Sequence, residues 1–281
     1  MIKGIFEIKS ILTAFDRPLK RIYSQSIGIT IFKTKLSVIG LVLVTEFYKF
    51  ILFLIVYYTS LMKPVKFPRV KVCCMSSVEE ALAAIELGAS ALGVVSKMPS
   101  GPGVIPDEMI LEIVKVIPTG VASFLLTCEI KAEKIIEQQK MFKTNTLQLV
   151  DEIEVAEYEI IKKALPGIAI VQVVHVTDEK SIHYAMKVSK HVNAILLDSG
   201  NPNLKVKELG GTGKVHNWEI SRKIREAVEI PVYLAGGLNA ANVREAIEKV
   251  SPFGVDLCSG VRTDGKLDKI KLKDFFDKVY N

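Results

Sequence analysis

Hydrophobic and polar positions follow a repeating pattern from Arg69 to the C-terminus. Short apolar runs rich in β-branched residues alternate with segments in which apolar residues recur at helical spacing. The runs of strand type are Val70–Met75, Ala91–Ser96, Val121–Thr127, Thr146–Asp151, Ala169–Val176, Ala194–Asp198, Pro231–Ala235 and Gly254–Ser259. The segments of helix type are Val78–Leu87, Asp107–Val116, Lys131–Met141, Glu154–Leu165, Glu179–Ser189, Asn217–Val228, Ala240–Val250 and Leu267–Val279.

Eight strand–helix pairs joined by short connections predict an α/β fold, a (β/α)₈ TIM barrel. A doubly wound open sheet is the alternative, and it fits less well because the count reaches eight and then stops. In such a barrel, functional side chains gather at the carboxyl ends of the strands. The residues at those ends are Cys73, Ser96, Thr127, Asp151, His175, Asp198, Gly236 and Gly260.

The strand-like run Ala194–Leu197 is followed by a carboxylate, Asp198, and then by a long polar loop that closes on GGTGK at residues 210–214. An acid at the end of a buried strand, before a glycine-rich loop, is typical of an active site in a parallel α/β enzyme. We expect Gly211 and Gly213 to contact the substrate or its phosphate. A strand-capping Asp beside a flexible surface loop is the alternative interpretation.

Two glycine turns follow the last two strands. Gly236-Gly237 comes after the seventh strand, and Gly260-Val261 comes after the eighth. These loops commonly form a phosphate site in barrels, since glycine lets backbone N–H groups approach an anion. We therefore expect these four residues to bind a phosphate, although glycine also serves simply to permit a tight turn.

Residues 1–61 have a different character from the rest. The stretch Leu36–Leu61 is long enough to cross a bilayer and is interrupted only by Glu46 and Lys49. It fits a membrane anchor, an interfacial or partner-binding helix, or translated sequence upstream of the mature protein, with Met62 as an alternative start. We treat 1–61 as a hydrophobic extension outside the functional unit, and 62–281 as the catalytic barrel domain.

Charge and cysteine usage narrow the class of protein. The formal net charge of +6 is concentrated in residues 1–68, which carry +7, so the remainder carries −1 and gives no reason to expect nucleic-acid binding. The four cysteines show no metal-ligand spacing and no disulfide framework, which indicates free thiols in a reducing compartment. They are Cys73, Cys74, Cys128 and Cys258.

Several ordered motifs of the barrel resemble phosphoribosylanthranilate isomerase, a family of tryptophan biosynthesis. The resemblance extends from Arg69 to the C-terminus. It is carried by Val70-Lys71-Val72-Cys73 with Glu79-Glu80-Ala81, Leu196-Leu197-Asp198 with the 210–214 loop and Trp218, Ala235-Gly236-Gly237-Leu238-Asn239 with Asn242-Val243, and Pro252-Phe253 through Asp256 to Ser259-Gly260-Val261.

The resemblance implies an Amadori rearrangement without a cofactor or a metal, in which Cys73 is the general base and Asp198 the general acid. Protonation of the ribose ring oxygen suits an aspartate whose pKa is raised by burial. The resulting iminium acidifies the neighbouring carbon, from which a Cys73 thiolate takes a proton. Lys71 lies on the same face of its strand as Cys73 and is a source of positive potential. A small buried apolar role is the alternative for Cys73.

This chain departs from the family at three places. The family motif Lys-Ile-Cys-Gly is altered by Cys74, which strand alternation directs toward the helices, where we expect it to be inert. The loop after the second strand, 97–105, lacks the family's arginine, and the family's Gln-Leu-His-Gly becomes Gln148-Leu149-Val150-Asp151. The nearest cations in sequence are Lys97 and Arg262, of which we expect Lys97 to face the substrate's non-phosphate end.

The leading hypothesis is therefore a cytoplasmic isomerase of a phosphorylated small molecule, N-(5-phosphoribosyl)anthranilate. The changed loop leaves room for a related sugar-phosphate isomerase or epimerase. A non-catalytic barrel that binds a phosphometabolite is a further alternative. Contact with a membrane is expected only if residues 36–61 are present and inserted, and the sequence leaves the oligomeric state open.

Overall fold

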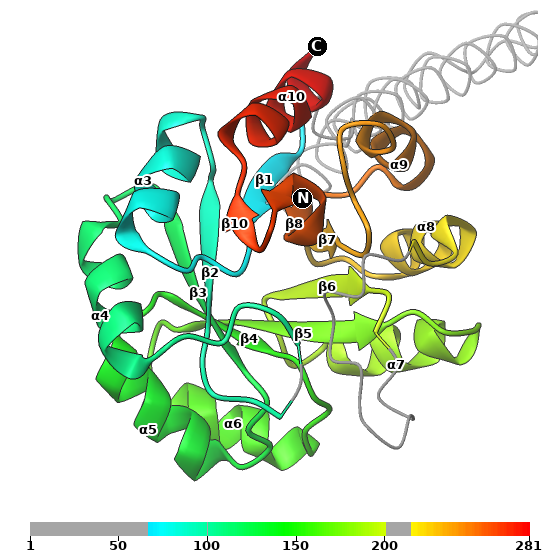
Figure 1. Ribbon diagram of the computed structural model, residues 1–281. Helices are drawn as coiled ribbons and strands as arrows, with labels where there is room; N and C mark the ends of the chain where they lie inside the picture. Colours follow the sequence, from blue (N-terminus) through cyan, green and yellow to red (C-terminus); the bar gives the residue numbers. More distant parts are fainter. Residues whose placement is uncertain (1–66, 100, 201–214) are drawn as a thin grey trace, which may run out of the picture. The chain divides into compact units, whose positions relative to one another are not determined.

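The computed structural model describes residues 67–99, 101–200 and 215–281. Within these ranges, eight parallel strands close into a barrel in the order β1 to β8. The strands are β1 Arg69–Val72, β2 Ala91–Val95, β3 Ala122–Thr127, β4 Thr146–Leu149, β5 Ala169–His175, β6 Ala194–Asp198, β7 Val232–Leu234 and β8 Gly254–Leu257. The predicted TIM barrel is confirmed (Figure 1).

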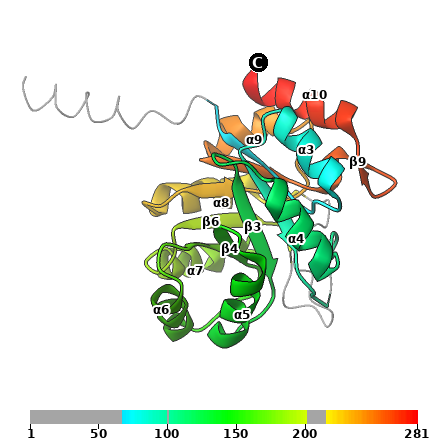
Figure 2. The ribbon, with the colours of Figure 1, turned by 90° about the vertical axis from the view of Figure 1, so that its left-hand side faces the viewer.

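Each strand is followed by a helix on the outside of the barrel, as Figures 1 and 2 show. The helices are α3 Val78–Glu86, α4 Asp107–Val116, α5 Ala132–Phe142, α6 Val155–Ala164, α7 Lys180–Val188, α8 Trp218–Ala227, α9 Val243–Val250 and α10 Lys269–Tyr280. Side-chain N-caps fix several of their starts, because the cap oxygen satisfies N–H groups that the first turn leaves unbonded. Ser77 caps α3, Asn217 caps α8 and Asp268 caps α10.

Alternation along the strands separates two apolar clusters. Outward-facing residues such as Val70 and Leu92 pack with the helices, while inward-facing residues such as Val171 and Leu196 fill the barrel. Aromatic rings are part of the filling: Tyr233 meets Phe124 and Phe253 edge to face, at centroid distances of 5.9 and 5.5 Å. The barrel interior is thus a packed core with its functional surface at the strand ends.

The end of the first strand differs from the prediction. The run Val70–Met75 was expected to be one strand, but β1 stops at Val72. Cys74 has φ of +61°, in the left-handed region, which no strand residue adopts. The regular alternation of side chains therefore ends before Cys74.

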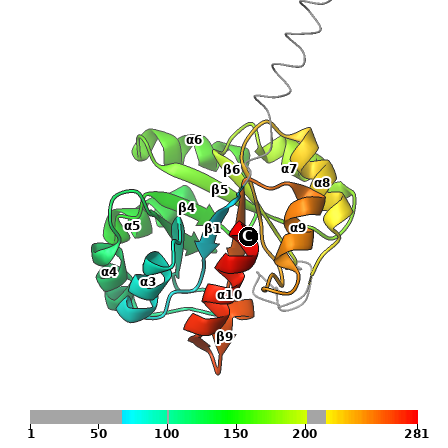
Figure 3. The same cartoon turned by 90° about the horizontal axis from the view of Figure 1, so that it is seen from above.

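A short insertion follows the eighth strand. The 3₁₀ turn η1, Ser259–Val261, leads into a small hairpin of β9 Arg262–Thr263 and β10 Lys266–Leu267, which projects beside α10 in Figure 3. Leu267 thereby belongs to the hairpin, so the last helix begins at Lys269 and not at Leu267 as predicted. The hairpin is bonded to the first turn of α3 through Glu80, which accepts a hydrogen bond from the Leu267 N–H at 2.9 Å.

The hydrophobic extension 1–61 and its stretch Leu36–Leu61 lie outside the described residues. Among the helices of the described ranges, none has both the length and the apolar character needed to span a bilayer.

Candidate active site

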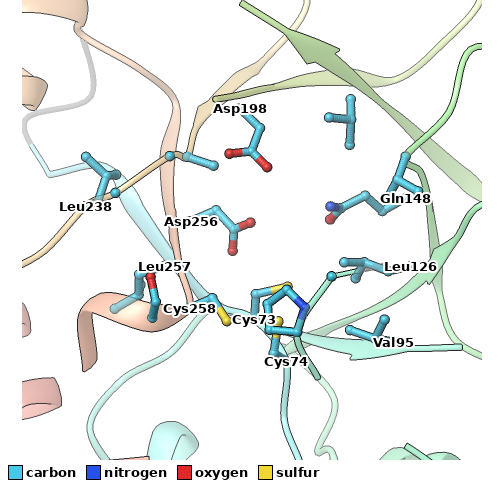
Figure 4. A pocket seen from close by; sticks show the side chains of 18 of the residues that line it. Cys73, Cys74, Val95, Leu126, Gln148, Asp198, Leu238, Asp256, Leu257 and Cys258 are labelled. Carbon is cyan, nitrogen blue, oxygen red and sulfur yellow. The ribbon is translucent and has the colours of Figure 1, made fainter. Parts of the chain in front are cut away.

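A pocket opens at the carboxyl ends of the barrel strands (Figure 4). Its walls come from residues of β2 to β6 and β8 and from loop residues, including those that follow β1 and β7. Two of the predicted residues, Cys73 and Asp198, line this pocket together. Its deeper wall is apolar and includes Val95, Leu126 and Val173. An apolar wall raises the energy of any charge placed there, so charged groups in this pocket must be paired or must titrate abnormally.

Cys73 follows β1 and is 5% exposed. Its N–H donates to the Leu257 carbonyl at 2.8 Å, which extends the β1–β8 ladder by one residue and keeps the side chain facing inward. A Cβ built on Gly93 of β2 would lie only 2.8 Å from the Cys73 Sγ and 3.2 Å from the Lys71 Nζ. Both groups therefore occupy the space that the missing side chain of Gly93 leaves.

Asp198 ends β6 and is 8% exposed. Burial raises the pKa of its carboxyl group, against the opposing effects of the Ser199 N–H, His175 and Lys71. The Ser199 N–H donates to its Oδ1 at 2.7 Å, and His175 is its register partner on β5. A carboxyl group with a raised pKa is suited to deliver a proton.

Lys71 forms a buried ion pair with Asp256, its register partner on β8, at 2.9 Å between Nζ and Oδ1. Burial alone would lower the pKa of Lys71, but the attraction of Asp256 and its hydrogen bond reverse the effect and raise it. The ammonium thus stays charged beneath Cys73 and beside Asp198. Lys71 also lies over the Phe124 ring, 5.1 Å from its centroid.

Cys74 does not face the helices, so that expectation was wrong. Its positive φ turns the residue out of the strand alternation, and its side chain packs with the barrel-interior cluster and lines the pocket. Gly103 lies against it, since a Cβ on Gly103 would come within 2.4 Å of the Cys74 Cβ. The family's glycine at this position is explained by the left-handed backbone, which glycine adopts without strain.

The glycine turn after β7 lies at the pocket rim. Gly236 and Gly237 line the pocket and have φ of +82° and +64°. The amides of Asn239 and Asn242 donate to the Gly237 carbonyl at 3.3 and 3.0 Å and so fix the turn. Neither glycine N–H has a hydrogen bond to another described residue. The turn therefore presents donors to a ligand.

The turn after β8 packs directly on the first one. A Cβ on Gly260 would lie 2.0 Å from the Leu238 carbonyl oxygen, so only glycine permits this contact. Gly260 and Val261 lie outside the pocket lining, and the Val261 side chain is buried in the outer apolar cluster. The Val261 N–H donates to the Cys258 carbonyl at 3.5 Å.

Gly211 and Gly213, two of the remaining predicted binding residues, lie outside the described residues. Lys97, the third, is not part of this pocket lining. Lys97 is exposed and lines a neighbouring hollow, which shares Met98 with the central pocket.

Arg262, the other cation considered, is fully engaged by protein groups. Its two terminal nitrogens donate to both carboxylate oxygens of Glu80 at 3.0 and 3.1 Å, and also to the Cys74 and Gly265 carbonyls. Arg262 is therefore a brace between the loops after β1 and β8.

The pocket lining also includes Asp256, Cys258 and Gln148, which were not predicted as site residues. Inward alternation on β8 from Gly254 would have indicated the first two. The Gln148 Oε1 is buried without a hydrogen-bond partner among the described residues. No group of three or more His, Cys, Asp or Glu side chains in the described ranges is arranged to hold a metal ion.

Comparison with known proteins gives a consistent result over the barrel. Residues 70–278 match a family model described as N-(5'phosphoribosyl)anthranilate (PRA) isomerase. N-(5'-phosphoribosyl)anthranilate isomerase 2 of Methanosarcina mazei is 35% identical over 215 residues, which cover 76% of this chain and 94% of the relative. The isomerase of Methanocella arvoryzae is 32% identical over 212 residues, covering 75% and 97%.

Solved structures agree with the sequence relatives. Phosphoribosyl anthranilate isomerase of Thermotoga maritima is 31% identical with a TM-score of 0.65, covering 75% of this chain and 98% of that one. A phosphoribosyl anthranilate isomerase in complex with reduced 1-(o-carboxyphenylamino)-1-deoxyribulose 5-phosphate is 29% identical, with a TM-score of 0.62 and the same coverage.

Proposed function

The chain belongs to the N-(5'-phosphoribosyl)anthranilate isomerase family, and from this premise we propose that Cys73 is the general base of its reaction and Asp198 the general acid. The chain is an isomerase of tryptophan biosynthesis that converts N-(5-phosphoribosyl)anthranilate to the 1-amino-1-deoxyribulose 5-phosphate. The observation that supports the two roles is that both side chains line one pocket at the strand ends, on either side of the buried Lys71–Asp256 pair.

The two groups suit the two proton transfers that an Amadori rearrangement requires. Asp198, protonated because burial raises its pKa, gives its proton to the ribose ring oxygen as the C1–O bond breaks. The substrate nitrogen then forms an iminium, which acidifies the proton on C2. The Cys73 thiolate removes that proton, and the resulting enol tautomerises to the ketone.

The charge of Lys71 supports the base. Its ammonium and the Cys73 Sγ both lie against Gly93, and attraction to Cys73 contributes to the raised pKa of Lys71. The ammonium therefore places a positive charge next to the Cys73 Sγ. Asp256 holds the ammonium in place. It does not fully cancel the positive charge of Lys71, since that charge still opposes the rise in pKa that burial causes at Asp198.

We place the substrate phosphate at the paired turns after β7 and β8. Gly236 and Gly237 line the pocket, and their N–H groups have no hydrogen bond to another described residue. Gly260 lets the second turn approach within contact of the first. Anions bind well in such nests of backbone N–H groups. Val261 contributes by closing the η1 turn, and Gly211 and Gly213 of the preceding loop complete the proposed set.

We place the anthranilate ring against the apolar wall beneath the loop after β2. Met98 and Pro102 of that loop line the pocket together with Leu126 and Val150. Arg262 is paired with Glu80, so we propose Lys97, the cation of this loop, as the partner of the anthranilate carboxylate. The carboxylate would reach Lys97 through the neighbouring hollow, which meets the central pocket at Met98.

We further propose that residues 62–281 form the catalytic unit and act in the cytoplasm. The family match begins at residue 70, and the four cysteines are free thiols, as a reducing compartment allows. Comparison of turnover between residues 62–281 alone and the full chain tests the boundary: loss of turnover in the folded fragment would contradict it.

The roles are tested by growth of a tryptophan auxotroph that lacks this isomerase. The full chain and the control Cys128→Ser are expected to restore growth without tryptophan, because Cys128 lies outside the pocket. Cys73→Ser and Asp198→Asn are expected to fail while accumulating as folded protein. Growth of either variant at the rate of the unaltered chain would remove that residue from its proposed role.

A further inference from the structure

Three thiols lie at one wall of the pocket, where β1 and β8 end: Cys73, Cys74 and Cys258 (Figure 4). Val72 is the register partner of Leu257, and the Cys73 N–H bonds to the Leu257 carbonyl. Cys258 therefore lies opposite Cys73, and Cys74 is one residue further along the chain. A side-chain hydrogen bond nevertheless brings the sulfurs of Cys74 and Cys258 together, as a disulfide between them requires.

The surroundings of each side chain indicate which two of the three thiols can form a disulfide. Cys73 is directed toward Gly93 and Lys71, as the close approach of its Sγ to the Gly93 position shows. The positive φ of Cys74 takes its side chain out of the strand alternation, and a Cβ built on Gly103 would lie 3.0 Å from its Sγ. The Cys74 side chain interacts with Cys258 and also with Cys73. Because Cys73 belongs to the proposed acid–base site, Cys258 is the partner that we assign to Cys74.

The two sulfurs differ in their readiness to ionise. Their mutual hydrogen bond raises the pKa of Cys74 and lowers that of Cys258, and Arg262 lowers the latter further. The loops that carry them are braced by Arg262, which bonds Glu80 and the Cys74 carbonyl, and by the Ser76 N–H, which donates to Glu80 at 3.0 Å. Cys258 is thus the more readily ionised of the two thiols.

We propose that Cys74 and Cys258 are a modification site, at which a low-molecular-weight disulfide such as glutathione disulfide reversibly oxidises them and slows the isomerase. The Cys258 thiolate attacks one sulfur of the reagent and expels a thiolate, which takes a proton from water. Cys74 gives its proton to solvent and attacks the Cys258 sulfur, expelling the second thiolate. Two electrons pass from the cysteines to the reagent, which leaves as two thiols.

Disulfide formation changes the pocket because Cys74 is bonded to the residue that carries the proposed base. Closing the two sulfurs to about 2.05 Å draws the Cys73–Cys74 peptide toward β8. Cys73 then leaves its position against Gly93 and Lys71. A displacement of about 1 Å in a reacting group can cost up to about 10²-fold in rate. This effect on rate rests on the proposed role of Cys73, whereas the disulfide itself does not.

The experiment treats the full-length protein with glutathione disulfide and measures linked peptides, free thiols and turnover. We expect a Cys74–Cys258 linked peptide, loss of two of the four thiols, and a fall in turnover of up to about 10²-fold that dithiothreitol reverses. Cys128→Ser is expected to respond like the unaltered protein. Cys258→Ser is expected to keep its own starting turnover under the same treatment, because the attacking thiolate is absent. Cys74→Ser is expected to stop at a mixed disulfide between Cys258 and glutathione and to give no linked peptide.

Cys73→Ser separates this site from the catalytic assignment, because it is expected to form the same linked peptide although its turnover is already low. A linked peptide that contains Cys73, no linked peptide at all, or linked protein with unchanged turnover would overturn the proposal. Reversible inactivation of Cys258→Ser as fast as that of the unaltered protein would also overturn it.

Discussion

The Lys71 ammonium and the Asp256 carboxylate meet at 2.9 Å inside the barrel, with their side chains 0% and 7% exposed. They come from the first and last strands, 185 residues apart, and are register partners. Burying two charges carries a large desolvation penalty, which only their mutual attraction and hydrogen bond offset. Removal of either partner therefore leaves an unpaired buried charge.

Breaking this pair is expected to destabilise the barrel more than removing both charges. Lys71→Met should lower the free energy of unfolding by about 3–5 kcal/mol, the usual result when one partner of a buried pair is removed. The double variant with Asp256→Leu should be less destabilised than the sum of the single variants, as measured in a double-mutant cycle by chemical denaturation. The exposed pair Lys273–Asp277 is the control, and Lys273→Met should cost at most about 1 kcal/mol. Additive single effects would contradict the coupling.

Turnover is expected to depend steeply on the proposed base and acid. Cys73→Ser and Asp198→Asn should each reduce kcat by about 10²–10⁴-fold, the range of general acid–base contributions. Their melting temperatures should stay close to that of the unaltered chain, since both changes conserve side-chain volume. Steady-state kinetics with the control Cys128→Ser measures the effect. A near-normal kcat for Cys73→Ser would direct the search for the base to Asp151 at the end of β4.

The pH dependence of the acid follows from its environment. Because burial raises the pKa of Asp198, its protonated form persists to a higher pH than in an exposed aspartate. The kcat of the unaltered chain should fall as pH rises through that pKa. The residual rate of Asp198→Asn should lack this limb of the profile. A limb that persists in Asp198→Asn would assign it to another group.

The phosphate position is tested at Gly237, whose left-handed backbone tolerates Asn and Asp better than other residues. Gly237→Asp should raise KM about tenfold or more, because a hydrogen bond to a charged group contributes about 1.5–3 kcal/mol and the new carboxylate repels the phosphate. Gly237→Asn adds nearly the same volume without charge and serves as the control, with a smaller rise in KM. Equal KM values for the two variants would mean that the phosphate lies elsewhere.

His216, before α8, makes stability depend on pH. Burial lowers the pKa of His216 to about 4 from an ordinary value of 6.5, while its Nε2 lies 2.7 Å from the Ser221 hydroxyl. The unfolded chain therefore binds more protons than the folded one between these values, and the free energy of unfolding falls as pH drops from about 6.5 to 4. The loss from this residue is at most about 3 kcal/mol.

His216→Gln replaces the imidazole by an amide that reaches the Ser221 hydroxyl without titrating. Chemical denaturation at pH 7 and pH 4.5 should show a smaller pH dependence for this variant than for the unaltered chain. The exposed His183, changed to Gln, is the control and should leave the pH dependence unchanged. The buried carboxyl groups contribute equally to all three proteins, so only the difference between them reports on His216. Identical pH dependence in His216→Gln would contradict the prediction.

The sequence pattern predicted the barrel and placed Cys73 and Asp198 at its strand ends, because both depend on local alternation along the strands. Their proposed roles as base and acid came from the family resemblance. The pattern mispredicted Cys74, since a positive φ at one residue reverses which face a side chain takes. The Lys71–Asp256 pair and the Arg262–Glu80 brace were not predicted because each joins residues about 180 positions apart, and only closure of the barrel makes them neighbours. Local periodicity carries no information on such pairs.

The last prediction concerns the substrate carboxylate and the loop after β2. The loop contributes Met98 and Pro102 to the pocket and no guanidinium group, so the carboxylate has only Lys97 as a proposed partner from this loop. A single exposed ammonium gives up to about 1 kcal/mol, much less than a bidentate arginine. Lys97→Met should therefore raise KM for N-(5-phosphoribosyl)anthranilate severalfold at most.

The analogue without the carboxylate is expected to have a KM similar to that of the substrate in Lys97→Met, because the contact that distinguishes them is gone. Lys115→Met, on the exposed face of α4, is the matched control and should preserve the difference between the two compounds. Steady-state kinetics of both compounds with the three proteins gives the comparison. If Lys97→Met still discriminated strongly against the analogue, the carboxylate would be bound by another group, and the 201–214 loop with its lysines would be the next place to test.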